Sequence, residues 1–142
     1  MQVLKKQCKI SGCDTLQVWL ESGIHQNGVE LVLGDDLNID GNALYIEGRQ
    51  VGRRVDVSTS EGQSKARSMA GSVEWILLDL GEWKMIPIEN VIASCDGGPT
   101  RVAARISSAE QVLGAAFALE IGVDALLVTE DILPTALIAK SQ

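Results

Sequence analysis

The second half of the chain alternates apolar runs of strand length with polar-flanked stretches of helical length. The apolar runs at residues 73–80, 101–106 and 123–129 predict three strands. The stretches before, between and after them predict helices over residues 58–70, 87–94, 107–120 and 132–140. Ser58 with Glu61, and Ser107 with Glu110, have the spacing of capping boxes. Because residues 75–78 are apolar at every position, we expect parallel strands that helices cover.

The first half has shorter elements. Leu16, Trp19 and Leu20 recur at helical spacing and predict a short helix over residues 14–22. Strands are predicted at 29–33, 43–46 and 51–57, the last two joined as a hairpin. The fold class is therefore α/β: a largely parallel sheet built from strand-helix repeats, either a partial barrel or an open sheet, with an N-terminal hairpin. A single domain over residues 1–142 is expected.

Composition and charge limit the classes of binding partner that the chain can have. No apolar run approaches the roughly 20 residues of a bilayer span, and the first ten residues lack the apolar core of a secretory signal, so we expect no membrane partner and a cytoplasmic protein. The net charge of -7 argues against nucleic acid. Arg53 and Arg54 lie on a solvated face or, if they converge, bind an anion. A small-molecule metabolite is the remaining partner class.

The histidine and cysteine content argues against a metal site. The chain has one histidine, His25, and three cysteines, none of them in CxxC spacing. A structural zinc site or a Cys/His or Ser/His/Asp catalytic set needs more of these ligands or bases. No metal is predicted.

The loop after residues 73–80 carries the strongest candidate chemistry. In parallel α/β proteins, ligands bind at the carboxyl ends of the strands. This loop and the start of the next helix contain Asp79, Glu82, Lys84 and Glu89. The Lys84 amine would act as a general acid or form a Schiff base, with Asp79 or Glu82 as proton acceptor. The alternative is a surface ion pair of Lys84 with Glu82 or Glu89.

Other candidates follow the next two strands. Arg105 lies near the end of residues 101–106, where its guanidinium would bind a carboxylate or phosphate, or pair with a neighbouring acid. Glu130 and Asp131 follow residues 123–129 and would bind a cation or a sugar hydroxyl, although helix capping also explains Asp131. No GxGxxG motif follows a strand and no P-loop motif is present, so a dinucleotide fingerprint is absent.

One segment carries a family resemblance. Residues 75–93 combine a strand, an aspartate, Trp83-Lys84, an Ile-Pro pair and Glu89-Asn90 before an apolar helix. This string resembles the 3-dehydroquinate synthase of the second type, found mainly in archaea. Residues 46–48, 55–59, 107–110 and 119–128 are also similar to that family, and the likeness runs from about residue 43 to residue 130.

The resemblance implies an activity and a cofactor. Members of the family carry out an NAD-dependent oxidative deamination and cyclisation of an amino-dideoxy-heptulosonate to 3-dehydroquinate, in aromatic amino-acid biosynthesis. A lysine beside a carboxylate suits this chemistry, so we expect Lys84, Asp79 and Glu82 in catalysis. From their positions after the predicted strands, we expect Glu89, Arg105 and Glu130 in substrate binding.

Length leaves two hypotheses open. Family members are considerably longer than this chain, so the leading hypothesis is a homologue of their amino-terminal half. The alternative is a non-catalytic module that binds a small molecule or a protein partner. Because a partial sheet leaves an edge and an apolar face to cover, a homo-oligomer is expected.

Overall fold

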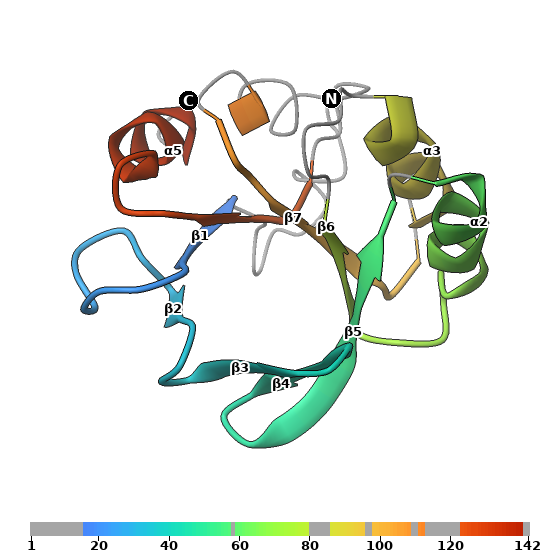
Figure 1. The fold of residues 1–142 in the computed structure, drawn as a ribbon, viewed down its shortest axis with the longest axis horizontal. Helices are drawn as coiled ribbons and strands as arrows, with labels where there is room; N and C mark the ends of the chain where they lie inside the picture. The colour runs from blue at the N-terminus through green and yellow to red at the C-terminus, as the bar shows by residue number, and fades with distance from the viewer. Residues whose placement is uncertain are drawn as a thin grey trace.

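The computed structural model describes residues 16–57, 59–79, 86–95, 98–108, 111–112 and 123–140 (Figure 1). Eight strands form one sheet in the order β2-β1-β8-β7-β6-β5-β4-β3. The strands are β1 (Gln17–Leu20), β2 (Leu31–Val32), β3 (Leu37–Asp40), β4 (Ala43–Ile46), β5 (Arg49–Asp56), β6 (Trp75–Asp79), β7 (Arg101–Arg105) and β8 (Ala125–Val128). The helices are α2 (Ser60–Ser68), α3 (Ile86–Cys95) and α5 (Leu133–Lys140).

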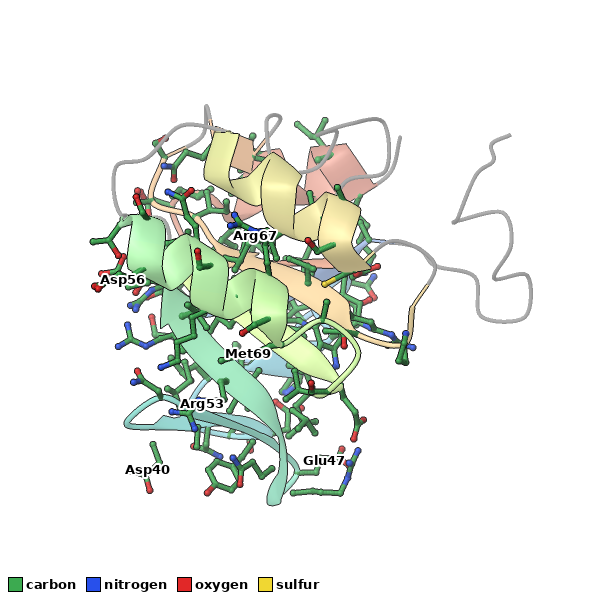
Figure 2. All side chains as sticks on the ribbon, turned by 90° about the vertical axis from the view of Figure 1, so that its right-hand side faces the viewer. Asp40, Glu47, Arg53, Asp56, Arg67 and Met69 are labelled. Carbon is green, nitrogen blue, oxygen red and sulfur yellow. The ribbon has the colours of Figure 1, made fainter. Side chains whose placement is uncertain are left out.

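The strand directions confirm the predicted α/β class. Strands β5, β6, β7, β8, β1 and β2 run parallel to one another. Strands β3, β4 and β5 are antiparallel neighbours, which confirms the hairpin predicted from residues 43–57 and adds β3 beside it. In Figure 2, α2 and α3 lie next to each other over the outer face of the sheet, with Arg53 on β5 below them.

The sheet curls until its two edges meet. A bridge between Leu33 and Leu37 joins the end of β2 to the start of β3, so the sheet is a nearly closed barrel (Figure 1). Its inner face is filled by a buried cluster that includes Trp19, Trp75 and Leu77, with the two indole centroids 4.7 Å apart. The inner apolar face is therefore covered by the chain's own side chains. Association between copies stays a prediction.

The helix predicted over residues 14–22 is wrong where the structure describes it, because residues 17–20 form β1. This strand lies between β2 and β8. Trp19 faces the inner cluster, whereas Val18 and Leu20 belong to the outer cluster beneath the helices. A short strand buried on both faces places apolar residues at consecutive positions, and some of these coincide with helical spacing.

The three helices confirm their predicted positions, with one change at a helix start. Thr59 caps α2: its Oγ1 accepts a hydrogen bond from the Gly62 N–H at 3.0 Å, whereas Ser58, the predicted cap, lies outside the described residues. Most of the helix predicted over 107–120 also lies outside them, although the Gln111 side chain accepts the Ser107 N–H at its start. Within the described ranges, no helix is long and apolar enough to cross a membrane.

Candidate functional site

A cavity of about 500 Å³ lies at the carboxyl ends of four neighbouring parallel strands. These strands are β1, β8, β7 and β6, and the side chains that follow them are mostly polar. This is the end of a parallel sheet where ligands are expected. The lining residues are Glu21, Asp79, Arg105, Ile106, Ser107, Thr129 and Asp131.

Arg105 is held by two carboxylates from different strands. Its Nε donates to Glu21 Oε2 at 2.9 Å and its Nη2 donates to Glu21 Oε1 at 3.0 Å, a bidentate pair. Its Nη1 lies 3.6 Å from Asp79 Oδ2. Arg54 Nη1 donates to the same Asp79 oxygen at 2.7 Å. Two guanidinium groups and two carboxylates thus form one chain of charges at the edge of the cavity.

The electrostatics keep the Arg105 guanidinium charged. The hydrogen bonds from its side chain to Glu21 raise the pKa of Arg105, partial burial opposes that rise, and the charges of Glu21 and Asp79 add to it. The Arg105 side chain remains 37% exposed, compared with 17% for the Glu21 side chain. A permanent positive charge therefore reaches the cavity while its counter-ion is largely covered.

The structure brings together three of the residues that the sequence indicated. Asp79 and Arg105 both line the cavity. Glu130 lies on the exposed turn after β8 with its carboxylate against Gly23, and Asp131 is the residue of this turn that lines the cavity. Lys84 and Glu82 lie outside the described residues. Glu89 belongs to α3, but its side chain also lies outside the described part of the structure.

Sequence reasoning missed Glu21, and it did not place Arg54 beside Asp79. Glu21 directly follows β1, so recognising residues 17–20 as a strand would have placed it at the carboxyl end of the sheet. Arg54 lies on β5 and is the register partner of Leu77 on β6. Asp79 is two residues further along β6, within reach of the Arg54 side chain. Only the strand register shows this closeness.

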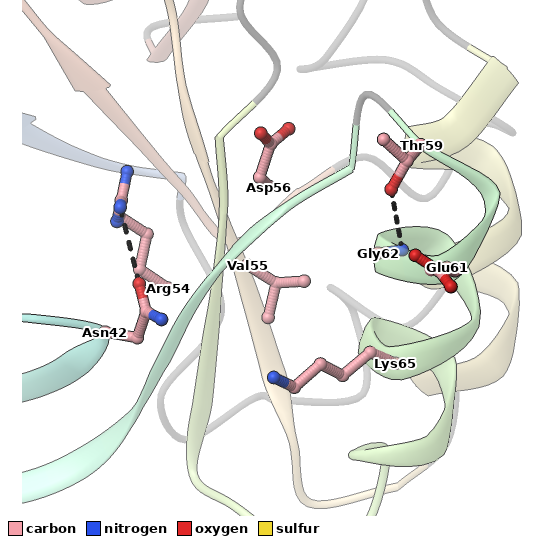
Figure 3. Close-up of a pocket in the computed structure, with 8 residues that line it drawn as sticks. All are labelled: Asn42, Arg54, Val55, Asp56, Thr59, Glu61, Gly62 and Lys65. Atoms are coloured by element: carbon pink, nitrogen blue, oxygen red, sulfur yellow. Dashed lines mark hydrogen bonds between the residues drawn. The ribbon is translucent and has the colours of Figure 1, made fainter.

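A second cavity of about 500 Å³ lies beside α2 (Figure 3). Arg54 lines it and donates from Nη2 to Asn42 Oδ1 at 3.3 Å, and the Lys65 ammonium points toward it in Figure 3. Because successive residues of a strand face opposite sides, Arg53 and Arg54 do not converge on one anion. Arg54 connects this cavity to the Asp79 carboxylate.

A nearly closed, mostly parallel sheet with a charged cavity at its carboxyl edge defines the class: an α/β barrel-like protein with a charged pocket at its carboxyl edge. A sequence profile of the 3-dehydroquinate synthase II N-terminal domain matches residues 14–137. The chain therefore belongs to the 3-dehydroquinate synthase II family, which confirms the resemblance seen in residues 75–93.

Curated relatives support the same family. A 3-dehydroquinate synthase of Methanocorpusculum labreanum is 27% identical over 92 residues, which are 65% of this chain and 27% of the relative. The synthase of Methanothrix thermoacetophila is 31% identical over 80 residues, covering 56% of this chain and 22% of the relative. The synthase of Methanobrevibacter smithii is 23% identical over 123 residues, covering 83% and 33%.

The chain corresponds to only part of these proteins. The matched segments span 22% to 33% of the lengths of the three synthases named above. No solved structure matches the chain. The family is thus established by sequence, and the geometry of the site rests on this structure alone.

Proposed function

We propose that this chain binds the carboxylate-bearing amino sugar of the 3-dehydroquinate synthase reaction and takes part in its NAD-dependent deamination and cyclisation. One observation carries the proposal. Asp79 and Arg105 face each other at the cavity, and Asp79 directly precedes the loop that holds Lys84. An acid and a guanidinium at one strand edge, followed in the sequence by an amine, suit a substrate that carries both a carboxylate and a carbonyl group.

Arg105 is the residue that we assign to the substrate carboxylate. Its Nη1 has Asp79 Oδ2 at 3.6 Å, which is longer than a normal hydrogen bond, so this nitrogen retains capacity to donate. Guanidinium groups bind carboxylates through paired hydrogen bonds. The bidentate contact with Glu21 fixes the plane of the Arg105 side chain before a ligand arrives.

Asp79 and Lys84 would carry the proton transfers. Among the described residues, Arg54 and Arg105 both pair with Oδ2 of Asp79, so Oδ1 is the oxygen that we assign to proton transfer. A carboxylate so oriented would accept a proton from the substrate amine or from the Lys84 ammonium. Glu82, two residues before Lys84, is the second candidate acceptor. Glu89 is assigned to a substrate hydroxyl, and Asp131, which lines the cavity, takes the hydroxyl role expected of Glu130.

NAD is the oxidant that family membership supports. The chain has no glycine-rich dinucleotide fingerprint, so binding must rest on other groups. The cavity beside α2 offers Arg54 and Lys65, whose charges suit a pyrophosphate. These residues would hold the cofactor, which when bound supplies a hydride acceptor. The biosynthetic role also supports a cytoplasmic setting.

The test separates binding from turnover. NADH formation from the amino-dideoxy-heptulosonate, and calorimetric binding of 3-dehydroquinate, would be measured for the wild type, Arg105→Ala, Lys84→Ala and Arg49→Ala. Arg49 is the matched control, since its exposed pair with Glu74 lies at the opposite end of β5 from Arg54.

The proposal expects saturable 3-dehydroquinate binding that is lost in Arg105→Ala and kept in Arg49→Ala, and turnover that is lost in Lys84→Ala. It is contradicted if the wild type does not bind, or if Arg105→Ala binds as well as the wild type.

A further inference from the structure

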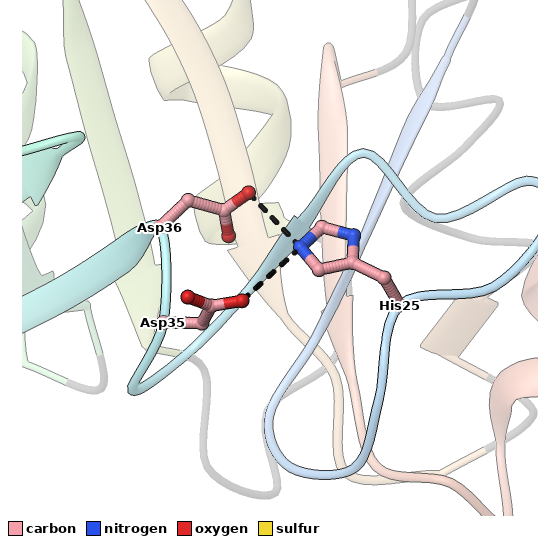
Figure 4. A group of neighbouring side chains, drawn as sticks. All are labelled: His25, Asp35 and Asp36. Carbon is pink, nitrogen blue, oxygen red and sulfur yellow. Dashed lines mark ion pairs between the residues drawn. The ribbon is translucent and has the colours of Figure 1, made fainter.

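A group of metal-ligating side chains lies apart from the cavity. His25 belongs to the loop after β1, whereas Asp35 and Asp36 form the turn between β2 and β3 (Figure 4). The His25 Nε2 atom lies 3.0 Å from Asp36 Oδ2 and 3.6 Å from Asp35 Oδ2. One ligand atom from each residue lies within 4.8 Å of the other two. Three potential ligands thus converge from two separate segments.

These separations match those around a small divalent ion. Ligand atoms at the usual zinc distances from a tetrahedral centre lie about 3.3–3.6 Å apart, and those around an octahedral ion of similar size about 3.0 Å apart. The two measured separations bracket these values. We propose that His25, Asp35 and Asp36 bind a divalent first-row transition ion of the Zn²⁺ type, with water completing its coordination.

Asp36 is oriented for this role before any ion binds. Its Oδ1 accepts the Val32 N–H at 2.7 Å, which turns Oδ2 toward His25. Its backbone oxygen accepts the Glu47 N–H at 2.7 Å, and its side chain is 23% exposed. A hydrogen bond to the second atom of a ligating group is the usual way in which proteins fix metal ligands.

The charge balance also calls for a cation. Two carboxylates approach the same imidazole nitrogen, which has one proton at most to donate. Over the described ranges, neither Asp35 nor Asp36 forms an ion pair with a lysine or an arginine. Two carboxylates that converge on one imidazole nitrogen repel each other, and a bound metal cation would relieve that repulsion. The expectation that no metal binds was based on the scarcity of histidine and cysteine, which does not bear on a site with two carboxylate ligands.

The position of the group suggests what the ion does. Asp35 and Asp36 lie between Leu33 and Leu37, the two residues whose bridge closes the sheet. A bound ion would tie the loop after β1 to this closing turn. Because an ion that binds only the folded chain stabilises it, the metal would strengthen the closure of the barrel. This inference is independent of the proposed function.

His25 provides its own reporter, because it is the sole histidine of the chain. In untagged, uniformly ¹⁵N-labelled protein, the long-range ¹H–¹⁵N spectrum contains one imidazole, which would be followed during a Zn²⁺ titration. We expect a saturable shift of the Nε2 resonance. The apparent Kd should weaken at least tenfold in Asp36→Asn and remain at the wild-type value in Asp40→Asn, an exposed aspartate on β3.

Two further measurements keep the outcome decisive. Backbone amide spectra would show whether Asp36→Asn retains the turn, and Asp35→Asn removes a ligand whose side chain is 70% exposed. If Zn²⁺ leaves the imidazole resonances unmoved, the proposal is overturned, even where the ion binds Cys8 or Cys13. It is equally overturned if both asparagine variants bind with wild-type affinity.

Discussion

Asp79 and Arg105 are register partners on the adjacent parallel strands β6 and β7, with Oδ2 and Nη1 3.6 Å apart. Each is the last residue of its strand. The pairing of β5 with β6 places Asp56 opposite Asp79 in the same row and brings Arg54 into contact with the Asp79 carboxylate. Strand register, and not a loop conformation, therefore builds the charged edge of the cavity.

Removal of the Arg105 guanidinium should destabilise the fold as well as abolish ligand binding. In Arg105→Ala, the largely covered Glu21 carboxylate loses both of its donors. We expect the free energy of unfolding to fall by about 2 kcal/mol, measured by urea denaturation. Arg49→Ala removes an exposed ion pair and should change it by less than about 1 kcal/mol. Equal losses in the two variants would contradict the structure.

Gly52 allows the backbones of β5 and β6 to approach closely. A Cβ at this position would overlap the carbonyl oxygen of Trp75, its register partner. Because both groups are backbone, no side chain can yield, and Gly52→Ala should lower the free energy of unfolding by about 3 kcal/mol. The control is Gly98→Ala, whose Cβ would have its nearest atom, Cys95 O, at 3.6 Å. A Gly52→Ala variant as stable as this control would refute the strand pairing.

Thr59, and not Ser58, should control the start of α2. Thr59→Ala removes the oxygen that accepts the Gly62 N–H, and we expect a loss of about 1 kcal/mol in the free energy of unfolding. Thr59→Ser keeps a capping hydroxyl and should stay close to the wild type. Thermal denaturation followed by circular dichroism measures both variants. If Ser58→Ala were costly and Thr59→Ala neutral, the capping assignment would be incorrect.

The pair formed by Arg49 and Glu74 predicts a pH effect. The hydrogen bond from Arg49 lowers the pKa of Glu74 below its ordinary 4.5, burial opposes this, and the charges of Arg49 and Arg101 assist it. A lowered carboxyl pKa stabilises the fold above the unfolded-state pKa, and this contribution disappears as the pH falls through the folded-state value. An NMR titration of the Glu74 carboxyl carbon should give a midpoint below 4.5 that rises in Arg49→Ala. An unchanged midpoint would show that the pair does not form in solution.

The sequence pattern predicts the parallel half of the fold well, because residues 75–79 and 125–128 are apolar at nearly every position, as central parallel strands require. Strand β1 was missed, because its burial on both faces imitates a helical pattern over so few residues. Strand β3 was missed because Asn38 and Asp40 weaken its strand propensity. Closure of the sheet depends on the stagger between strands, which brings Leu33 beside Leu37. No local sequence pattern indicates this stagger.

Some residues of the candidate site could likewise be predicted from the sequence, and others could not. Asp79 and Arg105 could be predicted because each ends a recognisable strand. Glu21 could not be predicted because the strand before it, β1, was not predicted. The group of His25, Asp35 and Asp36 joins two segments that come into contact only when the sheet closes. Lys84, Glu82 and the side chain of Glu89 lie outside the described residues, so their roles stay predictions.

A map of where 3-dehydroquinate binds tests whether the cavity beside Arg105 is the ligand site. Amide ¹H–¹⁵N spectra of the labelled chain would be recorded during a titration with 3-dehydroquinate. We expect saturable shifts concentrated at Glu21, Asp79, Arg105 and Thr129, which line the cavity, and their loss in Arg105→Ala but not in Arg49→Ala. Saturable shifts confined to other parts of the molecule, or no saturable shift at all, would contradict this expectation.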